Sequence, residues 1–237
     1  MTTMTAAYGA GTITFTLRRR PRTTLDIAVD DEGNVIVTAP EHAANEEVVR
    51  RVARHGRWIT AQRQYFEQFR PRTPPRTWLP GETHLYLGRQ YRLRVGNPDA
   101  THRRVRLIRG FLLVDGVRFG DADKTERLVH AWYRDRATEV FARRLHECLR
   151  RFDTAAVAPV SMRIREMSTR WGSMSPGGVL SLAPALVRAP SDAIDYVITH
   201  ELAHRIEPHH GPAFWRVLAA AMPDYERRKT RLERALA

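Results

Sequence analysis

The sequence predicts a chain of the α+β class. Three observations support this prediction. Segments in which polar and apolar residues alternate, as expected of half-buried strands, occur in several parts of the chain. Runs with helical periodicity follow these segments, and most have a capping residue before them. Clusters of proline and glycine separate the two kinds of segment.

The N-terminal part is expected to contain one hairpin and one helix. Residues 1–11 are expected to be disordered. Residues 12–40 alternate polar and apolar side chains and predict a β-hairpin, with the Asp-Glu-Gly-Asn sequence at 31–34 as its turn. Asn45 can cap a helix that covers about residues 46–69.

The middle part begins at Arg70–Pro75, whose three prolines make it the best linker candidate. Residues 83–118 are then expected to form short strands with turns at Gly88 and at Arg109-Gly110. A long helix follows and runs to about residue 152. Its first turn offers two candidates for the N-cap, Asp121 and Asp123.

The last 80 residues are expected to hold two strands and three helices. Residues 160–167 and 178–182 predict strands, with a turn at 173–178 between them. A helix then opens after Pro190 and should stop before Pro208. Its expected N-cap is Ser191 or Asp192, and its expected core stripe is Ile194, Val197, Ile198 and Leu202. The two final helices are expected at about 213–221, opened by Pro212, and in the basic C-terminal segment.

The composition is that of an ordinary globular protein. The chain has 237 residues, of which 43% are hydrophobic and 27% charged. A single cysteine, Cys148, excludes an internal disulfide and a cysteine-rich zinc ribbon, and it favours a reducing, cytoplasmic setting. The N-terminus lacks the pattern of a signal peptide, and no stretch approaches the ~18 apolar residues of a membrane span.

The charge is strongly basic. The formal net charge is +13, and all but two of the 39 lysine and arginine residues are arginine. Arginine forks suit phosphate groups, so nucleic acid is a candidate partner. The alternative interpretation is that these arginines are solvated surface residues, because their clusters are spread along the whole length.

The most informative motif is His200-Glu201-Leu202-Ala203-His204, an HExxH sequence. On a helix, residues four apart lie one turn apart on the same face, so the two imidazoles can hold one divalent metal ion. A glutamate beside the metal-bound water is the arrangement of a zinc hydrolase, in which Glu201 would be the general base.

A catalytic zinc ion needs three protein ligands and one open position. His210 lies just beyond Pro208, where the chain can turn back toward the metal, and it is the preferred third ligand. The alternatives that spacing and ligand type leave open are His209, Glu207 and Glu226.

Several motifs together resemble the YgjP-like metallopeptidases, zincins related to the SprT and WLM families. The resemblance covers roughly residues 12–235. The segments that carry it are Arg170-Trp171-Gly172-Ser173, Pro190–Val197 before HELAH, His210–Trp215, Pro223-Asp224-Tyr225 and, more weakly, Arg22, Trp58-Ile59 and Tyr86–Tyr91. The sequence departs from the family pattern at Met174, where a cysteine is usual, and at His209, where an asparagine is common.

The resemblance implies a zincin-like metallopeptidase core, formed by a small mixed sheet and the motif helix, in residues 158–237. Residues 12–157 would form the N-terminal α+β region of the same family. The resemblance also favours His210 as the third zinc ligand and implies that Arg170–Ser173 lies close to the site. Arg170 could stabilise an oxyanion or a substrate carboxylate, or it could form a structural ion pair.

The leading hypothesis is therefore a cytoplasmic zinc metallopeptidase that acts on a protein or peptide substrate. Zn²⁺ would be bound by His200, His204 and His210, and Glu201 would activate its water. One alternative is a basic protein associated with nucleic acid that acts on DNA-bound proteins, as the SprT kinship would imply. The other is a metal-stabilised binding module without turnover.

Overall fold

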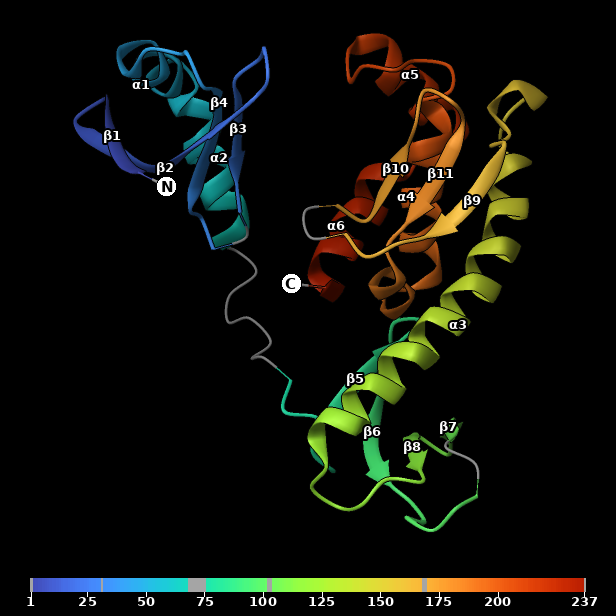
Figure 1. Ribbon diagram of the computed structural model, residues 1–237. Helices are drawn as coiled ribbons and strands as arrows, with labels where there is room; N and C mark the ends of the chain where they lie inside the picture. Colours follow the sequence, from blue (N-terminus) through green and yellow to red (C-terminus); the bar gives the residue numbers. More distant parts are fainter. Residues whose placement is uncertain (1, 31, 68–75, 102–103, 168–169, 237) are drawn as a thin grey trace. The chain divides into compact units, whose positions relative to one another are not determined.

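The computed structural model describes residues 2–30, 32–67, 76–101, 104–167 and 170–236 (Figure 1). The proposed linker, Arg70–Pro75, lies outside the described residues. The α+β class is confirmed, because these described residues form six α-helices and three small sheets. The chain divides into two compact units, residues 1–73 and 74–236, and not at the expected boundary between residues 157 and 158.

The first unit is a four-stranded sheet covered by two helices. The strand order is β1-β2-β4-β3. The elements are β1 (Thr2–Tyr8), β2 (Gly11–Arg20), β3 (Asp26–Val29), β4 (Val35–Pro40), α1 (Asn45–Arg54) and α2 (Gly56–Glu67). Its core joins residues of the sheet, such as Phe15 and Val37, to Val48, Val52 and Ile59 of the helices.

Residues 1–11 were expected to be disordered, and this expectation is wrong. β1 pairs antiparallel with β2 along its whole length, from Thr2 opposite Leu17 to Tyr8 opposite Gly11. Ala6 is buried and Met4 packs against the same core, so the inward positions of this strand do carry apolar side chains. They are small or flexible, which makes the alternation hard to recognise in the sequence.

The expected hairpin over residues 12–40 is also only partly correct. The antiparallel hairpin is β3–β4, whereas β2 pairs in parallel with β4, with Phe15 opposite Val35. The single helix expected at 46–69 is two helices that meet at His55. A Cβ atom at Gly56 would overlap the ring of Tyr8, so a glycine lets the helix lie against β1. Asn45 does not cap α1; its side chain accepts a hydrogen bond from Arg19.

The second unit contains two sheets and four α-helices. The first sheet has the order β5-β6-β8-β7, and the second has the order β10-β11-β9. Its elements are β5 (Thr83–Tyr86), β6 (Arg89–Val95), β7 (Arg104–Ile108), β8 (Phe111–Asp115), α3 (Ala122–Leu149), β9 (Ser161–Ile164), β10 (Gly172–Met174), β11 (Val179–Leu182), α4 (Ser191–Ala203), α5 (Pro212–Ala221) and α6 (Tyr225–Leu236), with short 3₁₀ helices at Ala155–Val157 (η1) and Pro184–Arg188 (η2). No helix in the described ranges is both long and apolar enough to cross a bilayer.

The local turn and cap signals of this unit are confirmed. Gly88 and Gly110 each have a positive φ and follow a residue with a positive φ, as the tight turns of the β5–β6 and β7–β8 hairpins require. Asp121, and not Asp123, caps α3, since its carboxylate accepts a hydrogen bond from the main-chain amide of Lys124 at 3.1 Å. α5 begins at Pro212, as expected.

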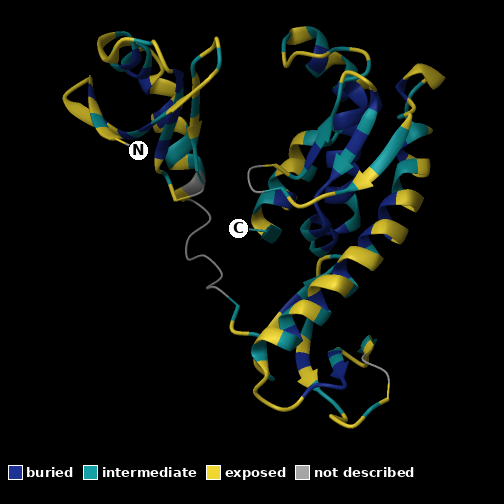
Figure 2. Ribbon diagram, viewed as in Figure 1, coloured by how far each residue is buried: buried dark blue, intermediate teal, exposed yellow. Residues whose placement is uncertain are grey.

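The second sheet is mixed: β11 pairs in parallel with β9 and antiparallel with β10. Residues 173–178 were expected to form a turn, but Ser173 and Met174 belong to β10, an edge strand next to the motif helix α4. The N-cap position of α4 is Pro190, so neither Ser191 nor Asp192 has that role. The predicted core stripe of α4 is buried (Figure 2).

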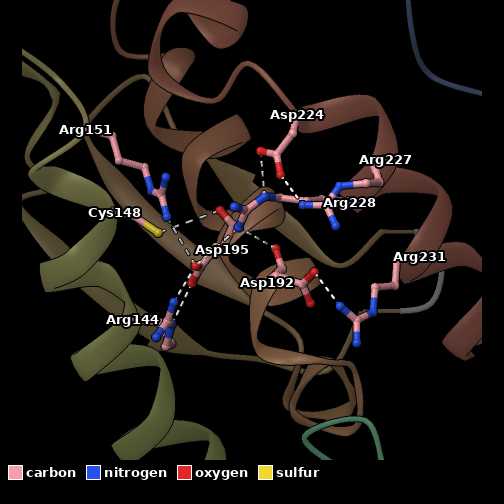
Figure 3. Close-up of polar contacts among 9 residues, drawn as sticks. All are labelled: Arg144, Cys148, Arg151, Asp192, Asp195, Asp224, Arg227, Arg228 and Arg231. Carbon is pink, nitrogen blue, oxygen red and sulfur yellow. Dashed lines mark hydrogen bonds and ion pairs between the residues drawn. The ribbon is translucent and has the colours of Figure 1, made fainter.

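The motif helix is tied to its neighbours by one buried carboxylate, that of Asp195 (Figure 3). Asp195 is 2% exposed. Its two oxygens accept hydrogen bonds from the guanidinium of Arg144 on α3. Arg151, just beyond α3, and Arg228 on α6 approach the same carboxylate at 3.4 and 3.6 Å. The Asp195 side chain therefore links α4 to both α3 and α6.

We expect Asp195→Asn to lower the stability of the fold strongly. The substitution leaves three guanidinium groups around a neutral amide, and losing one partner of a buried ion pair costs about 3–5 kcal/mol. For a unit of this size that corresponds to a decrease in Tm of roughly 6–15 °C, measurable by calorimetry. Asp224→Asn is the matched control, because Asp224 also pairs with Arg228 but is more exposed. Equal decreases in the two variants would contradict this account.

Candidate metal centre

Three histidine side chains converge at the C-terminal end of α4. His200 lies in the last turn of the helix, and His204 is its C-cap residue. The chain then turns through Pro208 and brings His210 back in front of α5. One ring nitrogen of each histidine lies within 4.8 Å of the others, and Nε2 of His200 and Nε2 of His210 are 2.9 Å apart.

Neighbouring groups orient these imidazoles. Nδ1 of His204 lies 3.2 Å from the main-chain oxygen of Glu207, to which it can donate a hydrogen bond, and Nε2 of His204 is then left as the metal ligand. The ring of Phe214, which is fully buried, lies 4.6–4.9 Å from the ring centres of all three histidines. Phe214 therefore provides an apolar surface against which the three imidazole rings pack.

The protonation state of the site suits a metal. Burial, followed by the neighbouring His210, His204 and Lys229, lowers the pKa of His200 to about 3. Burial and His204 also lower the pKa of His210. Both imidazoles are consequently neutral near pH 7, which is the form that binds metals. Three imidazoles at this spacing match the donor set of zinc, whose bonds to nitrogen are about 2.0–2.1 Å long.

Glu201 lies beside this group and is 8% exposed. Burial raises the pKa of its carboxyl group to about 7, and the main-chain amide of Met174 and the charge of Arg170 oppose that rise. Gly172 permits this close approach of β10: a Cβ atom there would lie 2.9 Å from Cγ of Glu201 and 2.9 Å from Cγ1 of Val197. The Arg170–Ser173 segment thus adjoins Glu201, and the side chain of Arg170 is exposed.

Among the residues that the structure describes, the group able to hold a metal consists of His200, His204 and His210. The other residues considered as third ligand, His209, Glu207 and Glu226, are not part of it. The roles of Gly172 and Phe214 cannot be recognised from the sequence alone. Both belong to motifs that were recognised, Arg-Trp-Gly-Ser and Phe-Trp, but their contacts with the site depend on tertiary packing.

Comparison with known proteins identifies a family. A family model described as "YgjP-like, metallopeptidase domain" matches residues 23–235. No curated protein matches the chain. Among solved structures, the crystal structure of the metallopeptidase zymogen of Pyrococcus abyssi abylysin is similar at 23% sequence identity and a TM-score of 0.34; the match covers 39% of this chain and 90% of that one.

Removing one imidazole from the convergent group should weaken metal binding strongly. We expect His210→Ala to bind zinc at least about 100-fold more weakly than the unmodified chain, because even the loss of an outer partner of a zinc ligand costs 10–100-fold. Competition with a chromophoric chelator measures the affinity. His209→Ala is the adjacent control and should retain one zinc ion per chain. Zinc loss in His209→Ala with retention in His210→Ala would reverse the assignment.

Proposed function

Because the chain belongs to the YgjP-like metallopeptidase family, we propose that it is a zinc-dependent peptidase. In this proposal His200, His204 and His210 bind the zinc ion, and Glu201 is the general base. The observation that carries it is the convergence of three imidazoles next to a buried carboxylate on the same helix. The single cysteine favours a reducing, cytoplasmic location.

A bound zinc ion would polarise the scissile carbonyl and lower the pKa of a water ligand toward 7. Glu201 would accept the proton of that water as it attacks the carbonyl carbon, and would then pass the proton to the leaving amine. The buried position of Glu201 supports this role, because burial brings its pKa close to the pH at which it would work.

The surroundings of Glu201 suggest how its carboxylate is held. The main-chain amide of Met174 interacts with it, and Gly172, which has no side chain, lets it lie close to β10. Arg170, whose charge reaches Glu201, is available to bind a substrate carboxylate or the developing oxyanion. An edge strand and a motif helix would together shape the reaction site.

We expect Glu201→Gln to keep its zinc and to lose peptide hydrolysis. The amide has nearly the same size as the carboxylate but cannot accept the proton, and a positioned base contributes about 10²–10⁴-fold to the rate. Zinc content by elemental analysis and cleavage of unfolded casein are the two measurements. If casein is not cut, a comparison of the cleavage products that each form generates from a whole-cell protein extract replaces it.

The same variant tests the alternative of a metal-stabilised binding module. That alternative requires Glu201→Gln and the unmodified chain to behave identically, with chelation lowering the Tm and changing no cleavage product. Zinc content near zero in the purified unmodified chain would contradict both the peptidase and the binding module.

Gly172→Ala should reduce hydrolysis without removing the metal. The added methyl group would lie 2.9 Å from Cγ of Glu201, so the carboxylate must shift. A displacement of about 1 Å in an active site can cost roughly 100-fold in rate. Gly177→Ala, in the turn after β10, is the control, since its Cβ would meet only the Ser175 hydroxyl at 3.9 Å. Equal activity in the two variants would remove Gly172 from the proposed site.

A further inference from the structure

The β5–β8 sheet has two chemically different faces. One face packs on α3: Leu93, Leu112 and Val114 are buried in the main core, and Tyr91, Val95, Val105 and Leu107 pack against that core. The residues between them along each strand point to the other side of the sheet. This second face, which we call the arginine face, includes Arg92, Arg94, Arg104, Arg106, Ile108, Phe111, Leu113 and Asp115.

The strand register arranges the arginine face in three rows. The middle row, on β8, is Phe111, Leu113 and Asp115, and Asp115 lies opposite Arg104. Arg92 on β6 and Ile108 on β7 lie on either side of Phe111. Arg94 and Arg106 lie on either side of Leu113. Because neighbouring strands are about 4.8 Å apart, two rows of arginine residues run about 10 Å apart, and the row between them holds the apolar side chains of Phe111 and Leu113 and ends in Asp115.

Most of this charge is not neutralised within the protein. Arg106 pairs with Asp115 at 2.7 Å. Over the described residues, no ion pair joins a carboxylate to Arg92, Arg94 or Arg104, and all three side chains are exposed. The segment 83–115 has seven arginines and two aspartates, with no lysine or glutamate, and hence a formal net charge of +5.

The aromatic residue of the arginine face is already in contact with a cation. The guanidinium carbon of Arg94 lies 5.2 Å from the centre of the Phe111 ring. Phe111 is only partly buried and does not belong to the main core. The guanidinium lies over the phenyl ring, so its outer face is the planar surface on which another planar group can stack.

We propose that the arginine face binds single-stranded nucleic acid. Arginine forks pair with phosphates, and the Arg94 guanidinium that lies over the Phe111 ring offers a planar surface on which a base can stack. An open sheet face is too broad to enter a groove of duplex DNA, so single strands fit it better. This site lies on the sheet that packs against the first half of α3, whereas the candidate metal centre adjoins the other sheet (Figure 1).

The test measures binding of a fluorescein-labelled 20-nucleotide oligothymidine to the full chain by fluorescence anisotropy over a range of salt concentrations. We expect the variant Arg92→Ala/Arg94→Ala/Arg104→Ala to bind at least about 10-fold more weakly at low salt. The slope of log K against log salt should fall in magnitude by about 2, because each phosphate contact to a single strand contributes about 0.7. Phe111→Ala should weaken binding about fivefold or more with an unchanged slope.

Two control variants distinguish binding at the arginine face from nonspecific attraction to the positive charge of the whole protein. Arg127→Ala/Arg143→Ala/Arg150→Ala removes the same charge from exposed positions of α3 and its C-cap, and it should bind like the unmodified chain. Arg92→Lys/Arg94→Lys/Arg104→Lys keeps the charge and should retain most of the phosphate affinity. Equal Tm values in all variants show that each has folded.

Three results would overturn the proposal. The first is undetectable binding of the oligonucleotide by the unmodified chain. The second is equal weakening by the two arginine-to-alanine variants, which would indicate diffuse electrostatics. The third is equal affinity for polyglutamate or for anionic lipid vesicles at the same salt, which would assign the arginine face to acidic proteins or to a membrane surface.

Discussion

The placement of the motif helix depends on the carboxylate of Asp195. A buried charge is tolerated only where opposite charges and hydrogen bonds compensate its loss of hydration. Here the compensation comes from Arg144 on α3, Arg151 beyond it and Arg228 on α6. All of these arginines can reach the Asp195 carboxylate only when α3, the residues just beyond it, α4 and α6 are in one particular arrangement. Their relative positions are therefore specified by charge as well as by the shape of the apolar core.

The geometry of the candidate metal centre depends on this arrangement of the helices. His200 follows Asp195 by five residues on the same helix. The ion-pair network that fixes the position of α4 therefore also fixes the main-chain position of His200. Beyond the helix, the Glu207 carbonyl orients His204, and Phe214 of α5 supports all three rings. Nδ1 of His200 has no hydrogen-bond partner among the described residues. The surrounding packing holds the three imidazoles together.

Features governed by local rules were predictable from the sequence. The turns at Gly88 and Gly110, the start of α5 at Pro212 and the buried stripe of α4 each depend on a few neighbouring residues. β1, β10 and the parallel pairing of β2 with β4 depend on distant partners, which a single sequence does not reveal. For the candidate site, helical spacing pairs His200 with His204. Spacing alone does not distinguish His209 from His210, because they differ only in the direction in which each side chain leaves the turn.

The long helix α3 explains why the expected boundary between residues 157 and 158 does not divide the chain. In its first half, the Tyr133 hydroxyl donates a hydrogen bond to the main-chain oxygen of Leu85 on β5. In its second half, Arg144 reaches Asp195, and the Cys148 thiol lies 3.7 Å from the main-chain oxygen of the same residue. One rigid element thus contributes to the cores under both sheets. A cut after residue 157 would expose the apolar side of α3 and leave Asp195 with only Arg228, so the sheet with the arginine face and the candidate metal centre must fold as one unit.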